Sequence, residues 1–105
     1  MSIANRLILY ETAQETIGLM LALLTEEIQS EERKDAPDPA KLERLNADSE
    51  RLDDELYSLR LTDAAAIQRV LNEYGPILKA DFERHRQSVE QSLPHTDPER
   101  TTLAD

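Results

Sequence analysis

The stretch Ile17-Gly-Leu-Met-Leu-Ala-Leu-Leu24 is the most apolar part of this 105-residue chain, and it decides the fold. It lies within a longer pattern whose members recur at alternating spacings of four and three: Ile3, Leu7, Tyr10, Gln14, Ile17, Leu21, Leu24 and Ile28. This spacing keeps one face of an α-helix apolar along its whole length. Leu19, Met20 and Leu23 fall outside that face, so the middle of the helix is apolar on more than one side. We therefore expect more than one neighbouring element to cover it.

The apolar pattern predicts a first helix over residues 3–33. Ser2 is its expected N-cap, because a serine hydroxyl accepts a hydrogen bond from a free backbone N–H of the first turn. The segment Asp35-Ala-Pro-Asp-Pro39 ends this region, since proline lacks an amide donor and disfavours helical geometry in the preceding residue. Asp38 is then the expected cap of a second helix over residues 39–60, with proline at its first position.

A third helix is predicted over residues 63–92, after a start signal at Thr62. Gly75-Pro76 interrupts its apolar stripe, and a proline inside a helix loses one hydrogen bond and clashes with the preceding turn. We expect either a kink or a clean break there. The turn positions predict an antiparallel three-helix bundle, in which the first two helices fold back on each other and the third folds back along the second.

Composition supports a single all-α domain over residues 1–93, followed by a flexible polar tail over residues 94–105. The chain has two glycines and no tryptophan, and leucine dominates its apolar residues. Its length suffices for one small core. There is no cysteine, which excludes disulfides and thiolate metal sites in the unmodified chain.

The net charge is −10, from 22 acidic and 12 basic residues. Such a charge disfavours direct binding to nucleic acid or to an anionic membrane. The N-terminus lacks the regions of a secretory signal, and the eight-residue run 17–24 is shorter than the ~20 residues that span a bilayer. We therefore predict a cytoplasmic protein that binds neither nucleic acid nor membrane.

No residue pattern predicts a catalytic, cofactor or metal site. His85 lies on the apolar stripe of the third helix, where a histidine at the edge of the core is the commoner interpretation than a switch or ligand. It lacks a carboxylate at the Glu-x-x-His spacing of helical metal sites. His95 lies in the polar tail, and the acidic run Asp53-Asp54-Glu55 points in different directions around its helix. We predict a protein that is not an enzyme and needs no cofactor.

The first helix has more apolar surface than two narrow stripes can cover, which predicts a homodimer. The longer first and third helices should also overhang the second, leaving the first turns of helix one and the residues beyond Phe82 less covered. Gln14 would either fix the register of the interface or lie at a wet edge. Tyr57 lies beside a stripe and is a candidate anchor for a partner. The predicted interface residues are Tyr10, Gln14, Ile17, Leu19, Met20, Leu21, Leu23, Leu24 and Tyr57.

These features predict a small, acidic, non-catalytic module for protein–protein interaction, an adaptor or regulator that acts as a homodimer with a further protein partner. The alternative is an acidic mimic of nucleic acid that blocks the basic groove of a nucleic-acid-binding protein. The even spread of charge and the interleaved arginines weaken that alternative. A metal or catalytic site inside the bundle is a third hypothesis, and only His85 approaches the position it requires.

Overall fold

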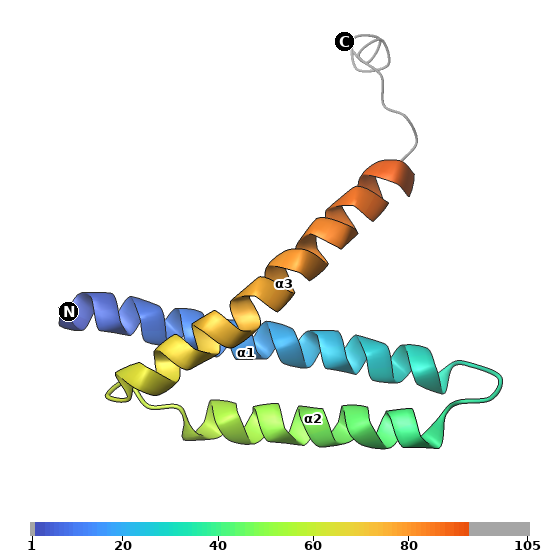
Figure 1. The fold of residues 1–105 in the computed structure, drawn as a ribbon, viewed down its shortest axis with the longest axis horizontal. Coiled ribbons are helices and arrows are strands. Elements are labelled where there is room, and N and C mark those ends of the chain that lie inside the picture. The colour runs from blue at the N-terminus through green and yellow to red at the C-terminus, as the bar shows by residue number, and fades with distance from the viewer. Residues whose placement is uncertain (1, 93–105) are drawn as a thin grey trace, which may run out of the picture.

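The computed structural model describes the backbone of residues 2–92 and the side chains of residues 2–87. It contains three helices, α1 (Ile3–Glu32), α2 (Pro39–Ser58) and α3 (Ala64–Ser92), and the described residues form no strand (Figure 1). The prediction of an all-α chain with three helices is confirmed, and each helix ends within two residues of its predicted bounds. The predicted tail, with His95, lies outside the described residues.

Two of the three helices begin with the predicted cap. The Ser2 hydroxyl accepts a hydrogen bond from the backbone N–H of Asn5 at 3.1 Å. Asp38 accepts from two backbone N–H groups in the first turn of α2, at 3.0 and 3.3 Å. At the start of α3 the capping side chain is Asp63 instead of Thr62, since its Oδ1 accepts from the backbone N–H three residues later at 3.0 Å. A carboxylate there also interacts favourably with the helix dipole.

α1 and α2 form a helical hairpin and run side by side in opposite directions (Figure 1). Their apolar stripes meet in one core cluster, in which Ile17 of α1 and Leu52 of α2 are 0% and 1% exposed. Leu21, Leu24 and Leu56 are half-buried against the same cluster. The hairpin therefore covers one side of α1.

A buried carboxylate closes the hairpin where α1 meets α2. The side chain of Glu31 is 3% exposed, and its two oxygens accept from Lys34 Nζ at 2.9 Å and from the backbone N–H of Asp38 at 2.9 Å. Lys41 Nζ of α2 lies 3.3 Å from the same carboxylate. The hydrogen bond from Lys34, then those from Asp38 and Lys41, lower the pKa of Glu31 from 4.5 to about 2, although burial opposes them. The ionised carboxylate thus links the last turn of α1, the connection and the first turn of α2.

The packing of α3 differs from the prediction. α3 crosses over α1 and does not fold back along α2 (Figure 1), and among the described residues no Cα atom of α3 lies within 8 Å of one in α2. Val70 and Tyr74 of α3 are buried in the same cluster as Ala13 and Ile17 of α1. α3 packs on α1 because α1 has apolar surface on a second side, with the small residue Ala13 there. α2 has one apolar stripe, and α1 already covers it. The prediction that helix three lies along helix two is wrong, and a closed bundle is not seen.

Polar side-chain contacts connect the first half of α3 to the end of α2. Tyr74 Oη donates a hydrogen bond to Glu55 Oε2 at 2.7 Å, and Arg69 Nη1 lies 3.3 Å from Glu55 Oε1. Burial, followed by the hydrogen bond to Glu55, raises the pKa of Tyr74 and so favours the protonated hydroxyl that donates. These contacts fix the direction in which α3 leaves the hairpin.

α3 continues through Gly75-Pro76 as one helix. The predicted clean break is therefore absent. Pro76 is exposed and Gly75 has an ordinary helical backbone, and the helix lacks the hydrogen bond that the proline nitrogen cannot donate.

Replacing Leu52 with alanine tests the hairpin core. Leu52 is almost fully buried between the helices, so Leu52→Ala should lower the free energy of unfolding by roughly 2–5 kcal/mol in urea denaturation. Ile8→Ala is the matched control, because Ile8 is an exposed apolar residue whose truncation should change stability by less than about 0.5 kcal/mol. Equal effects of the two substitutions would contradict this assignment of the core.

The Glu31 contacts predict a pH-dependent share of stability. Because the folded-state pKa lies below the unfolded value of 4.5, the stabilisation is fully present above that value and is lost as pH falls towards 2. Glu31→Gln should therefore be less stable than the unmodified chain at neutral pH, and the gap should close as the solution is acidified. The measurement is urea denaturation between about pH 7 and pH 3. In the control, Glu50→Gln removes an exposed carboxylate that has no ion pair in the described part of the chain, and it should open no such gap.

A candidate interaction cleft between two helices

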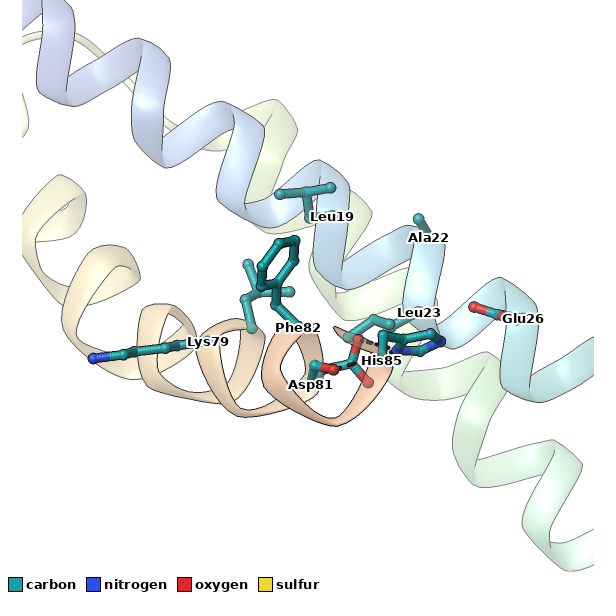
Figure 2. A pocket seen from close by; sticks show the side chains of 9 residues that line it. Leu19, Ala22, Leu23, Glu26, Lys79, Asp81, Phe82 and His85 are labelled. Atoms are coloured by element: carbon teal, nitrogen blue, oxygen red, sulfur yellow. Dashed lines mark hydrogen bonds and ion pairs between the residues drawn. The ribbon is translucent and has the colours of Figure 1, made fainter. Parts of the chain in front are cut away.

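An apolar cleft opens where α3 separates from α1. The inward stripe of α3 is buried as far as Tyr74 and then continues through Leu78 and Phe82, where α1 no longer covers it. Phe82 is 68% exposed although it lies on this stripe. The crossing of the two helices therefore leaves a space with one wall from each helix (Figure 2).

The other wall of the cleft comes from the second apolar side of α1. Leu19, which is 57% exposed, and Leu23 face Phe82 and its neighbours across the space (Figure 2). The cleft has a volume of about 450 Å³ and is open to solvent along one side. Its lining residues are Leu19, Ala22, Leu23, Glu26, Leu78, Lys79, Asp81, Phe82 and His85. A space of this shape, with an apolar middle, is suited to holding an apolar side chain or one face of a helix.

Opposite charges lie at the two ends of the cleft. Figure 2 shows Lys79 at one end and Glu26 at the other, with Phe82 and Leu19 between them. Neither Lys79 nor Glu26 forms an ion pair with any described residue. Asp81, by contrast, is paired within α3, since Arg84 Nη2 lies 3.3 Å from its carboxylate. Among the lysine and carboxylate side chains that line the cleft, the two without an ion pair in the described part of the chain are therefore those at its ends.

His85 lies at the edge of the cleft and not in a closed core. Its Nδ1 is 3.3 Å from both the carboxylate and the backbone oxygen of Asp81, one turn earlier on α3. Over the residues that the structure describes, no group of three histidine, aspartate, glutamate or cysteine side chains is placed to hold a metal ion. The contacts of His85 are those of an exposed helical side chain.

A smaller hollow beside the cleft brings Ser30, His85 and Asp81 around one space of about 280 Å³. Those residue types form a hydrolytic triad when the serine lies within hydrogen-bond distance of the histidine. No hydrogen bond joins Ser30 to His85 here, and both residues are exposed. The N–H groups around Ser30 also belong to an α-helix, which leaves no pair of donors for an oxyanion. This geometry gives no support to nucleophilic catalysis.

Most of the interface residues predicted on α1 are used within the chain. Ile17 is fully buried and offers no surface to another molecule. The Gln14 amide donates to the Tyr10 hydroxyl at 3.1 Å on the same helix, so it has a hydrogen-bond partner within its own chain. Four more of these predicted residues are half-buried and pack against the core, namely Tyr10, Met20, Leu21 and Leu24.

Three of the predicted interface residues remain available. Leu19 and Leu23 line the cleft, and Tyr57 stands alone on α2 at 84% exposure. The α3 wall of the cleft, with Leu78 and Phe82, was missing from the predicted interface. The signal for it was the overhang of the third helix, whose apolar spacing continues past the end of the hairpin.

α1 also has the length and composition of a membrane-spanning helix. It has 30 residues, and an 18-residue window within it reaches a mean hydropathy of 1.3, with 17% of that window buried in the folded chain. The prediction that excluded a membrane considered only the eight-residue run 17–24. Length and composition are equally those of a core helix in a soluble protein, so the absence of membrane binding and the cytoplasmic location stay predictions.

Comparisons of this chain with models of protein families, with curated proteins and with solved structures found no match. Its function is therefore inferred from the cleft and from the charges at its ends.

Proposed function

We propose that this chain is a small acidic helical module for protein–protein interaction, an adaptor or regulator that acts as a homodimer and performs no catalysis. The observation that supports the proposal is the uncovered apolar cleft between α1 and α3, with Leu19 on one wall and Phe82 on the other. The cleft contains large apolar side chains, and no catalytic constellation accompanies them among the described residues.

The exposed side chains of the cleft supply the driving force for association. Burial of one leucine or phenylalanine side chain contributes roughly 1.5–3 kcal/mol. Exposed aromatic residues that enter a pocket on a partner are also the usual anchors of protein interfaces. Phe82 is a large aromatic side chain that projects from α3 into an open apolar space, so it is suited to act as such an anchor.

A homodimer would also complete the helical packing that one chain leaves open. Within the chain, the half of α3 beyond Tyr74 lies against neither α2 nor a full face of α1 (Figure 1). A second copy would supply the missing neighbour, so that helices of two chains together form the antiparallel bundle. Tyr57, on the opposite element, stays free for a further protein partner.

The role of α1 in the fold favours a protein partner over a bilayer. α1 contributes Ala13 and Ile17 to the core that also includes α2 and α3, and its insertion into a membrane would separate those contacts. Glu11 and Glu15 are exposed in the first half of α1, where a bilayer would have to accommodate their charge. Binding to a protein surface would neither separate the core contacts of α1 nor place these carboxylates in a bilayer.

Mimicry of nucleic acid is the second candidate. It needs a row of carboxylates free to meet a basic groove. Several carboxylates of this chain are instead paired with arginines on the same helix, including Asp48 with Arg51 and Glu83 with Arg86. The structure thus offers no observation that favours this candidate over the apolar cleft.

Site-specific cross-linking tests the proposal. A photo-reactive amino acid placed at position 82 should join the chain to a protein, giving a product of about twice the 12.0 kDa chain mass or larger after illumination. The same amino acid at position 47, where Ala47 is exposed on α2 outside the cleft, is the matched control and should give little product. Gel analysis followed by mass spectrometry identifies what has been joined.

Two results would count against the proposal in different ways. No product above the Ala47 control would remove the cleft as an interaction site. A product that contained only lipid, recovered with membranes, would replace a protein partner with a bilayer.

A further inference from the structure

We infer that the cleft is occupied by α3 of a second copy, in a two-fold arrangement in which the two α3 helices lie antiparallel near Phe82 and Lys79 of each copy meets Glu26 of the other. This inference rests on the proposed function, because it names the partner of the same cleft. It adds a direction, a register and two specific ion pairs.

The first step is the match between the cleft and α3 itself. The cleft needs a helix with a continuous apolar stripe, and the part of α3 that overhangs α1 has one through Leu78 and Phe82. Ile77 is also exposed beside it. The same side chains can therefore line the cleft of their own copy and enter the cleft of the other. A two-fold interface requires such self-complementary surfaces.

The second step is the placement of charge. Lys79 and Glu26 lie at opposite ends of the cleft, on either side of Phe82 (Figure 2). A rotation of 180° about an axis near Phe82 exchanges the two ends, so Lys79 of one copy arrives beside Glu26 of the other, twice in each dimer. The adjoining hollow adds one charge of each sign at the same end, from Glu27 and Arg33, so Glu26 is the charge of that end that lines the cleft itself.

The third step is that these charges lack ion-pair partners among the residues whose side chains are described. Lys79, Glu26 and Glu27 form no ion pair with any residue whose side chain is described, although many other charges of α3 are paired along the helix. A parallel arrangement would bring Lys79 of one copy close to Lys79 of the other. Complementary charges of this kind fix orientation and register more than they add affinity. They therefore select the antiparallel two-fold dimer over other ways of covering the cleft.

The test uses two opposite charge reversals that differ only in which end they change. In Lys79→Glu, the side chains at positions 79 and 26 that meet at each end of the dimer would both be negative, and in Glu26→Lys they would both be positive. Each variant alone should show a dimer dissociation constant raised roughly tenfold in light scattering on a size-exclusion column. An equimolar mixture of the two variants should regain the affinity of the unmodified chain, because both ends of the mixed dimer are again complementary.

Matched substitutions separate this effect from general damage to the fold. Glu50→Lys reverses an exposed charge on α2 outside the cleft and should leave the dissociation constant unchanged. Phe82→Ser should raise it by roughly a hundredfold, whereas Tyr57→Ser removes a more exposed aromatic residue elsewhere and should not. Circular dichroism checks that every variant keeps its helices.

Three outcomes would overturn the inference. They are an unmodified chain that stays monomeric at every concentration, a dimer indifferent to Phe82→Ser, and a mixture of the two charge reversals that recovers no affinity. A monomer that still gives protein cross-links from position 82 would overturn the second copy as occupant and the homodimer with it, and would leave a module that binds a different protein. A monomer without such cross-links would remove both.

Discussion

α1 must be covered from two sides, and the rest of the structure depends on that constraint. Its apolar residues extend around the helix beyond a single stripe, so one neighbour cannot remove them from water. α2 covers one side and α3 crosses another, which makes α1 the helix that contacts both of the others in the described chain. The cleft follows from the same constraint, because a crossing helix covers α1 only near the crossing point and leaves apolar surface beyond it, including Leu19.

The two connections between helices act differently on the geometry. At the first, Glu31 binds both sides of the turn and closes the hairpin, so α1 and α2 remain side by side over their length. At the second, the contact between Tyr74 and Glu55 holds the first half of α3 against the end of α2, and no hydrogen bond or ion pair joins residues 75–87 to α1 or α2. The first connection therefore gives antiparallel packing along the length of the hairpin. The second gives a single crossing, beyond which the distal half of α3 diverges from α1.

The elements that the sequence predicted well are those with local causes. Ser2, Asp38 and the prolines around it set helix ends through hydrogen bonds to adjacent residues, and such effects are visible in a few letters. The direction of α3 depends instead on whether α1 or α2 buries more of its apolar stripe. That depends on the packing of all three helices, which the spacing of apolar residues does not reveal. For the same reason the sequence pointed to the apolar excess of α1 but assigned Ile17 to an interface, although α2 and α3 bury it. The sequence did not distinguish Glu31 from the other acidic residues, because Asp38 and Lys41 become its neighbours only after the hairpin closes.

The overhang of α3 has a consequence for its own helical order. A helical segment of about a dozen residues is marginal in water unless tertiary contacts hold it. Among the described residues, those of the other helices contact residues 77–87 along the side of α3 that lines the cleft. Backbone amides there should exchange with solvent far faster than those around the buried Val70 as long as the cleft is empty, and slowly once it is filled. The amide exchange rate of the distal half of α3 therefore distinguishes a chain with an empty cleft from a chain whose cleft is occupied.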